Sequence, residues 1–216
     1  MTSPIIVICS QKGGVGKSTL ARLVAREYAA TGWNVKIADL YVGQGTSFNW
    51  QALRLQSRGE PIIAVERFGS VDQALKVAHQ VEMLILDGPP HSTAGTLGIA
   101  QAANLILLPS GLSLDDLQPS VLLFHELVKK RIPRAKIAFA LCRVGDSDME
   151  ISEARQYITE AGYKVLSGFI PEKIAYGRAS DAGRALTEAR FPSLNSRTDE
   201  LAQSIVNHIT KMQSAA

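Results

Sequence analysis

The chain has 216 residues, of which 46% are apolar and 20% are charged, and its formal net charge is +3. A chain of this length can bury a full hydrophobic core, so the composition excludes a disordered chain, a fibrous protein and a disulfide-stapled miniprotein. The only two cysteines, Cys9 and Cys142, lie in separate apolar runs and indicate neither a disulfide framework nor a paired-thiol metal site. We therefore expect one domain over residues 1–216 in a reducing, cytoplasmic setting.

Apolar runs of strand length alternate along the chain with longer stretches of helical period. Continuous apolar runs are typical of strands buried on both faces, and their alternation with helices indicates a parallel sheet. We predict an α/β fold with a mainly parallel, roughly seven-stranded sheet flanked by helices on both faces. The predicted strands are Ile5–Cys9, Val35–Asp39, Ile62–Val65, Met83–Asp87, Leu105–Leu108, Ile137–Leu141 and Val165–Ile170. The predicted helices are Ser18–Ala30, Val71–His79, Asp116–Lys130, Ile151–Ala161 and Thr198–Met212.

Pro119 limits where the third of these helices can begin. Proline is tolerated in the first turn of a helix but removes a hydrogen bond further in. We therefore predict that this helix starts near Asp116 and that Asp115 or Asp116 caps it.

A glycine-rich segment, Ser10–Thr19, lies between the first predicted strand and the first predicted helix. Strand, loop and helix in this order are the setting of a phosphate-binding loop, in which backbone amides and the helix N-terminus face the phosphates. Lys17 would contact the β- and γ-phosphates, and the Ser18 hydroxyl would bind Mg²⁺. The nucleotide-binding residues expected from this loop are Gly13, Gly14, Val15, Gly16, Lys17, Ser18 and Thr19.

The loop departs from the usual phosphate-loop pattern, because Gln11 stands in place of its first glycine and a second lysine, Lys12, follows. In this respect the sequence resembles the deviant Walker A ATPases of the ParA/MinD group, whose loop reads K-G-G-x-G-K-[ST]. The resemblance implies a single-domain P-loop NTPase with ATP and Mg²⁺ as cofactors and Lys17 as a catalytic residue. It also implies that Lys12 reaches the partner's nucleotide in an ATP-dependent homodimer and acts in catalysis there.

Several later segments extend the resemblance. Asp87, followed by Gly88-Pro89-Pro90, resembles the Walker B and switch II segment, in which a carboxylate holds the Mg²⁺ shell; an aspartate that only caps the strand end is the alternative. The segment 109–117, which contains Asp116, resembles the proline-rich segment before the family's interface helix, and a simple helix cap is an equal interpretation. Asp87 is therefore the expected metal ligand beside Ser18.

The base-binding end of the site is less well specified. Residues 170–176 resemble the loop after the last strand that flanks the adenine, so Pro171 and Glu172 are candidate nucleotide contacts. Cys142 stands where many family members have an asparagine that reads the base, and Arg143 follows it as a further candidate. Base selectivity therefore follows less directly from the sequence than phosphate binding does.

Asp39 opens the segment that corresponds to switch I, for which the family pattern is D-x-D-x-Q-G. The resemblance makes Asp39 a candidate catalytic residue. Tyr41 stands where the family has a second aspartate that positions the attacking water. One extra residue precedes Gln44, so an open alternative is that Gln44 faces the water instead. We expect hydrolysis of ATP to ADP and phosphate to be slow in the absence of a partner.

The leading function is that of a ParA-like ATPase for plasmid or chromosome partition or for cargo positioning. ATP would close a homodimer that binds non-specific DNA and associates with the nucleoid, and a separate partner protein would stimulate hydrolysis. Up to Val128 the chain has 9 basic and 10 acidic residues, against 14 basic and 10 acidic residues from Lys129 onward. This excess favours phosphate contacts in the C-terminal part. The candidate DNA contacts are Lys129, Lys130, Arg131, Arg134, Arg178, Arg184 and Arg190.

Two other functions are alternatives. A small ATP-dependent metabolic ligase or synthetase of related fold would use the same loop to activate a carboxylate, but Lys12 argues against it. A MinD-like membrane-positioning ATPase needs a basic amphipathic C-terminal helix, whereas the polar face of the last predicted helix holds Asp199 and Glu200 beside Lys211. We therefore expect no membrane partner.

Overall fold

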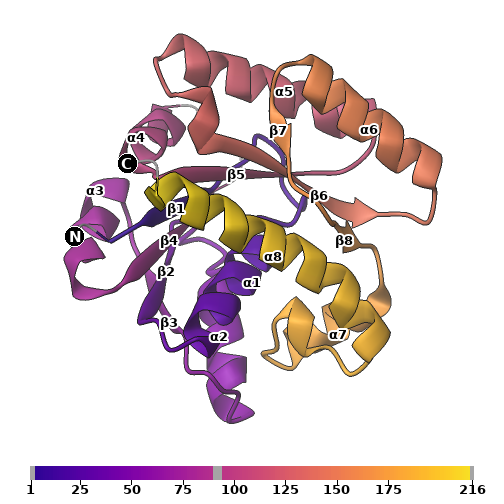
Figure 1. The fold of residues 1–216 in the computed structure, drawn as a ribbon. Coiled ribbons are helices and arrows are strands. Elements are labelled where there is room, and N and C mark those ends of the chain that lie inside the picture. The colour runs from indigo at the N-terminus through magenta and orange to yellow at the C-terminus, as the bar shows by residue number, and fades with distance from the viewer. Residues whose placement is uncertain (1–2, 90–93, 215–216) are drawn as a thin grey trace.

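The structure is a computed structural model that describes residues 3–89 and 94–214. Its strands are β1 (Ile5–Ile8), β2 (Val35–Asp39), β3 (Ala64–Arg67), β4 (Met83–Asp87), β5 (Leu105–Ser110), β6 (Ile137–Val144), β7 (Lys164–Val165) and β8 (Ile170–Pro171). Within the described residues, seven of them form a parallel sheet in the order β3-β2-β4-β1-β5-β6-β7, and β8 pairs with β6 (Figure 1). The prediction of a mainly parallel, roughly seven-stranded sheet is confirmed.

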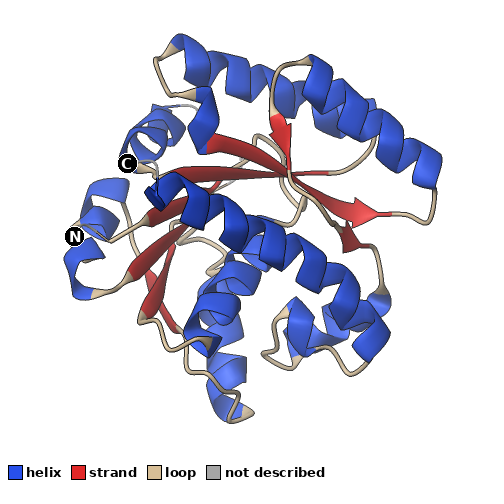
Figure 2. Cartoon of the chain, in the orientation of Figure 1, coloured by secondary structure: helices blue, strands red, loops and turns tan. Residues whose placement is uncertain are grey.

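Helices cover both faces of this sheet (Figure 2). They are α1 (Lys17–Ala30), α2 (Thr46–Gln56), α3 (Val71–Leu75), α4 (Ala94–Ala102), α5 (Leu114–Lys129), α6 (Asp148–Glu160), α7 (Ile174–Asp181) and α8 (Pro192–Ser214). Residues of α1, α2, α7 and α8 share one hydrophobic cluster, and residues of α3, α4, α5 and α6 share a second cluster on the opposite face. Ile6 belongs to the first cluster and Val7 to the second, because successive residues of a strand face opposite sides.

The central position of β1 determines where a ligand can bind. β1 pairs with β4 on one side and with β5 on the other, so the chain fills one half of the sheet with β2 to β4 and the other half from β5 onward. Open parallel sheets bind ligands beyond the carboxyl ends of their strands, where the strand order reverses. The loop after β1 lies at this point.

Among the described residues, no helix is long and apolar enough to cross a membrane.

Two predicted strands differ from the structure. The strand predicted at Ile62–Val65 begins two residues later, as β3, because Ala64 pairs with Lys36 while Ile62 is 65% exposed. β3 is an edge strand, and its Glu66 forms an ion pair with Lys36 at 2.8 Å. The strand predicted at Val165–Ile170 is two short strands, β7 and β8, which pair with different parts of β6.

The helix α5 corrects a prediction about capping. It begins at Leu114 with Ser113 in the cap position, so neither Asp115 nor Asp116 is the cap. Pro119 is consequently the sixth residue of the helix, beyond the first turn. Proline at this place leaves one carbonyl of the preceding turn without its intrahelical donor.

Three helices, α2, α4 and α7, were not predicted from the sequence. The buried positions of α2 are Ser47, Trp50 and Arg54, so two of its three core-facing residues are polar and the helical apolar period is absent. The helix predicted at Val71–His79 is shorter in the structure, where α3 ends at Leu75 and a separate 3₁₀ turn follows at Ala78–Gln80.

A buried ion pair attaches α2 to the segment after α7. Arg54 is 1% exposed, and its Nη1 and Nη2 donate to the two carboxylate oxygens of Glu188 at 2.7 and 2.9 Å. Arg54 also donates to the carbonyl of Gly183 at 3.0 Å, and Trp50 donates from Nε1 to the carbonyl of Arg184 at 3.2 Å. Burial opposes ionisation of Glu188, but the hydrogen bonds and the charge of Arg54 hold its pKa below the ordinary value of 4.5.

We predict that Glu188→Ala lowers the free energy of unfolding by about 3–5 kcal/mol at neutral pH, because it leaves the Arg54 charge buried and unpaired. Urea unfolding measures the effect. The control is Glu66→Ala, which breaks an exposed pair and should cost less than about 1 kcal/mol. Since the folded-state pKa of Glu188 is depressed, the difference between wild type and Glu188→Ala should shrink as pH falls below 4.5. Equal losses in the two variants would contradict this account.

Candidate nucleotide-binding site

The phosphate loop connects the carboxyl end of β1 to α1. Gly16 has φ of +104° and occupies the cap position of α1, and this backbone conformation strains any residue with a side chain. The buried Lys17 Nζ lies under the loop, where it donates to Ser10 Oγ at 3.0 Å and to the backbone oxygen of Lys12 at 2.8 Å. Burial lowers the pKa of Lys17, and the nearby carboxylate of Asp87 opposes this shift. The ammonium is therefore held at the loop before any phosphate arrives.

A cavity of about 230 Å³ opens above this loop, and we call it the phosphate cavity. Its walls come from the loop, from the start of α1, from the loop before α2 and from the end of β4. The first amides of α1 have no partners within the helix, so they are free to bind an anion. The lining residues are Gly13, Gly14, Gly16, Lys17, Ser18, Thr19, Tyr41, Gln44, Thr46, Asp87 and Gly88. Val15, which was expected to contribute to the loop, is buried and is absent from this lining.

Asp87 supplies a buried carboxylate at the end of β4. It is 3% exposed; Oδ2 accepts a hydrogen bond from Ser47 Oγ at 2.7 Å, and Oδ1 has no partner within the described residues. Burial raises the pKa of Asp87 to about 6, and the hydroxyls of Ser47 and Ser18 oppose part of this shift. Gly88 follows so close to β1 that a Cβ there would lie 2.8 Å from the Ile8 carbonyl oxygen.

These residues fit a magnesium ion that is bound together with a nucleotide. Mg²⁺ takes few protein ligands at nucleotide sites and completes its shell with phosphate oxygens and water. The unpartnered oxygen of Asp87 and the hydroxyl of Ser18 provide oxygen ligands of this kind beside the phosphate cavity. In the described part of the chain, no group of three or more His, Cys, Asp or Glu residues could hold a metal by itself. Pro90, at the end of the predicted switch II segment, lies outside the described residues.

The Asp39 carboxylate holds the switch I segment through hydrogen bonds to backbone amides. Asp39 is 1% exposed, and its carboxylate accepts hydrogen bonds from the backbone amides of Tyr41, Ser47 and Phe48 at 3.0–3.1 Å. This carboxylate therefore caps α2 and does not line the phosphate cavity. Tyr41, which stands where the family pattern has its second aspartate, does line it, and so does Gln44.

A second cavity, of about 340 Å³, continues from the first, and we call it the base cavity. The two share Gly14, Gly16 and Thr19, so a nucleotide could place its phosphates in one and its base in the other. All three residues predicted at the base end, Arg143, Pro171 and Glu172, line this second cavity. The structure thus brings together segments that are about 150 positions apart in the sequence.

The wall of the base cavity has two unusual features. Arg143 has φ of +57°, a conformation that is rare for residues other than glycine, and its Nε lies 3.6 Å from the carboxylate of Glu172. Cys142 packs directly under the phosphate loop, since a Cβ on Gly16 would lie 3.4 Å from the Cys142 Cβ. Burial raises the pKa of Cys142 to about 12, so its thiol is neutral at physiological pH.

Lys12 lies outside both cavities. Its Nζ forms an ion pair with Asp116 on α5 at 2.8 Å, and its side chain is 39% exposed. The two lysines of the loop therefore have different surroundings: Lys17 is buried beneath the loop, whereas Lys12 points to the exposed start of α5. Asp116 was expected to cap this helix, and its carboxylate holds Lys12 instead.

Sequence reasoning missed Arg22 as a site residue. This buried residue of α1 donates to the Thr46 carbonyl at 2.6 Å and to Ser180 Oγ at 2.8 Å, and it lines the base cavity. Burial lowers its pKa to about 10, although Asp87 and Asp39 oppose the shift. Its hydrogen-bond partners are 24 and 158 positions away in the sequence, so no local pattern separates it from a solvated helix residue.

A glycine loop after a central parallel strand, a buried carboxylate on the adjacent strand and two joined cavities define a P-loop nucleotide-binding domain. Residues 6–186 match the family model described as the CobQ/CobB/MinD/ParA nucleotide binding domain. The chain belongs to this family, and the predicted ParA/MinD-type P-loop fold is confirmed. A search of curated proteins finds no match.

Solved structures show the same fold at low sequence identity. The ATP complex of Cyanothece McdA(D38A) is 16% identical with a TM-score of 0.71, over 95% of this chain and 97% of that chain. A putative plasmid partition protein from Borrelia burgdorferi B31, bound to AMPPNP, is 16% identical with a TM-score of 0.69, over 97% and 99%. Cobyrinic acid a,c-diamide synthase from Mycobacterium smegmatis, with bound ADP and magnesium, is 15% identical with a TM-score of 0.67, over 95% of each chain.

We predict that Lys17→Ala weakens nucleotide binding by roughly 10- to 150-fold, because a charge-assisted contact to phosphate is worth about 1.5–3 kcal/mol. Titration with a fluorescent ATP analogue measures this affinity. Lys76→Ala, which removes an exposed lysine far from the loop in sequence, is the control and should bind like the wild type. An unchanged affinity in Lys17→Ala would rule out the proposed phosphate contact.

We predict that Asp87→Asn removes most of the effect of Mg²⁺ on nucleotide affinity. Asparagine preserves the shape of the side chain but lacks the negative charge that a magnesium ion requires. Nucleotide titrations with Mg²⁺ and with EDTA should differ by roughly 10-fold or more in the wild type and by little in the variant. If Mg²⁺ strengthens binding equally in both proteins, Asp87 is not part of the metal shell.

Proposed function

We propose that this chain is a ParA-like ATPase that binds MgATP, closes into a homodimer around it and positions DNA or another cargo. Lys12 supports this proposal most directly. Its ammonium lies outside the phosphate cavity of its own chain and pairs with Asp116 at the surface. In this place the Lys12 ammonium does not line the phosphate cavity of its own chain. It can instead reach a nucleotide that a second copy presents to the same face.

The exposed apolar residues of this face agree with such a dimer. Leu114 at the start of α5 is 57% exposed, and Ile174 at the start of α7 is 81% exposed. Both helices begin at the edge of the sheet that carries the nucleotide cavities. A second copy placed over the nucleotides would remove these side chains from water, and burial of apolar surface stabilises an interface.

Hydrolysis in the proposed dimer depends on Lys12, Lys17 and Asp39. Lys17 stabilises negative charge on the phosphates, and Lys12 adds charge from the partner subunit. Asp39 acts through the loop that it holds, whose Tyr41 and Gln44 line the phosphate cavity. Neither side chain supplies the carboxylate that normally orients the water, so we propose that intrinsic hydrolysis is slow and that a separate partner protein accelerates it.

A metabolic ligase is the competing function, because a cobyrinic acid a,c-diamide synthase has the same fold. That enzyme is only 15% identical to this chain, so the likeness extends to the fold alone. Two features favour a slow, partner-regulated ATPase over a metabolic enzyme. One is the presence of Lys12, and the other is that position 41 holds a tyrosine where the family has a catalytic carboxylate. We propose a cytoplasmic protein that associates with the nucleoid when it has bound ATP.

We predict that Lys12→Ala binds ATP with unchanged affinity as a monomer but fails to dimerise. The matched control is Asp116→Ala, which removes the intramolecular partner of Lys12 and should still dimerise with ATP. Light scattering of each protein with ATP and with ADP measures the mass. An ATP-dependent dimer of Lys12→Ala would contradict the action of Lys12 across the interface.

We predict that the wild type binds a random-sequence DNA duplex more tightly with ATP than with ADP. Its unstimulated ATP turnover should lie well below the roughly 1–100 s⁻¹ of kinases, and addition of DNA should increase it. Fluorescence anisotropy and phosphate release measure the two effects. Fast turnover that ignores DNA would favour the metabolic enzyme, and binding to anionic vesicles in place of DNA would favour a membrane-positioning ATPase.

A further inference from the structure

The buried Arg22 guanidinium connects residues of the two nucleotide cavities. Arg22 follows Ser18 by four residues on α1, so both side chains lie on the same face of the helix, one turn apart. Arg22 is 6% exposed and lines the base cavity. Because the phosphate loop leads directly into α1, this helix places Arg22 one turn after the residue that is expected to bind Mg²⁺.

Each terminal nitrogen of Arg22 donates to a residue of a different cavity. Nη2 donates to the carbonyl of Thr46 at 2.6 Å, and Thr46 lines the phosphate cavity at the start of α2. Nη1 donates to Ser180 Oγ at 2.8 Å, and Ser180 lines the base cavity from α7. The guanidinium is planar and holds its donors in a fixed fork, so a shift of one acceptor displaces the other or breaks a hydrogen bond.

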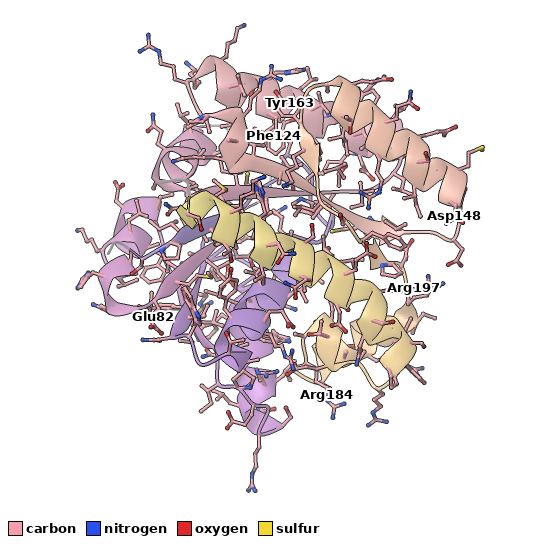
Figure 3. All side chains as sticks on the ribbon, in the orientation of Figure 1. Glu82, Phe124, Asp148, Tyr163, Arg184 and Arg197 are labelled. Carbon is pink, nitrogen blue, oxygen red and sulfur yellow. The ribbon has the colours of Figure 1, made fainter. Side chains whose placement is uncertain are left out.

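A second contact links the same elements. The Arg22 guanidinium carbon lies 5.3 Å from the centre of the Trp50 ring, which is a cation–π contact. Trp50 belongs to α2, and its Nε1 donates to the carbonyl of Arg184, another residue of the base cavity. Figure 3 shows Arg184 at the bottom of the molecule, beside α7. Buried contacts therefore join α2 to the wall of the base cavity at two places.

The charge of Arg22 is less well compensated than that of the other buried arginine, Arg54. Arg54 has a carboxylate partner, Glu188, at 2.7 Å, whereas Arg22 forms no ion pair within the described residues. The Nε of Arg22 also has no hydrogen-bond partner in this part of the chain. A buried charge without an ion pair is costly to desolvate, so stability alone does not explain an arginine at this place.

We propose that Arg22 is a positioning residue that makes hydrolysis depend on the base of the nucleotide. This inference rests on the proposed function and concerns how the same site is controlled. A base in its cavity packs against α7 and fixes Ser180, and Arg22 then holds Thr46 at the end of the switch I loop. This loop brings Tyr41 and Gln44 to the phosphate cavity, where catalytic groups act only when they are held in place. The shared contact gives the two cavities a coupling free energy.

Inorganic tripolyphosphate separates the two cavities, because it can fill the phosphate cavity but carries no base. Phosphate release from ATP and from tripolyphosphate is measured with Mg²⁺ at saturating substrate. We expect the wild type to turn over ATP at least roughly 10-fold faster than tripolyphosphate, the effect of about one charge-assisted hydrogen bond. This ratio compares kcat values, since saturation removes the contribution of the base to affinity.

Two variants break the connection at different ends. Ser180→Ala removes the hydroxyl acceptor on α7 and retains the whole Arg22 side chain. Arg22→Lys retains the charge but lacks the two separate nitrogens that reach Thr46 and Ser180. In both variants we expect the ratio of ATP turnover to tripolyphosphate turnover to fall from roughly 10 to about 1, because the base no longer acts on switch I. A merely structural defect would lower both rates and leave their ratio unchanged.

The matched control is Arg26→Lys, which makes the same substitution one further turn along α1. Arg26 contacts Glu27 and Glu188, and none of these three residues belongs to the described lining of either nucleotide cavity. This control should keep the wild-type ratio. In every variant, competition of tripolyphosphate with a fluorescent ATP analogue checks that the phosphate cavity is intact.

The outcomes distinguish this inference from the proposed function. If the wild type hydrolyses neither substrate, the proposed ATPase fails, and the inference fails with it. If the wild type hydrolyses ATP but its ratio is already near 1, or if Ser180→Ala and Arg22→Lys keep the wild-type ratio, the inference alone is overturned. A loss of tripolyphosphate affinity in these two variants would also overturn it, since Arg22 would then support the phosphate loop itself.

Discussion

The parallel pairing of β1 with β4 is the constraint on which the nucleotide site depends. In this register Ile8 lies opposite Asp87, so the chain leaves β1 toward the phosphate loop beside the buried carboxylate. The backbone of Gly88 approaches the Ile8 carbonyl too closely for any side chain. The candidate metal ligand and the phosphate loop are about 70 positions apart in the sequence, yet backbone hydrogen bonds fix them relative to each other before any ligand binds.

The two cavities are joined by buried polar contacts rather than by apolar packing alone. Arg22 bridges the start of α2 and the end of α7, and Arg54 ties α2 to Glu188. Each guanidinium is desolvated and contacts acceptors from distant segments, so a shift of one element leaves a buried charge unsatisfied. Buried hydrogen bonds therefore connect the switch I loop with the wall of the base cavity.

The two loop lysines illustrate how similar residues acquire different roles from their surroundings. Lys17 is buried and held by Ser10 and by the loop backbone, where it lines the phosphate cavity of its own chain. Lys12 has a carboxylate partner on α5 and remains partly exposed. An exposed ion pair contributes little stability, so the contact with Asp116 can be exchanged for another anion at small cost. This difference connects the departure from the common loop pattern with the proposed contact between subunits.

The sequence by itself determined the parallel sheet, the phosphate loop and the aspartate beside it, because these depend on local patterns: continuous apolar strands, a glycine loop between strand and helix, and a carboxylate at a strand end. It did not predict α2, whose core-facing residues include Ser47 and Arg54, because buried polar residues break the apolar period. It also could not place Arg22 or pair Lys12 with Asp116. Those features are contacts between segments that are distant along the chain, so only the tertiary structure decided them.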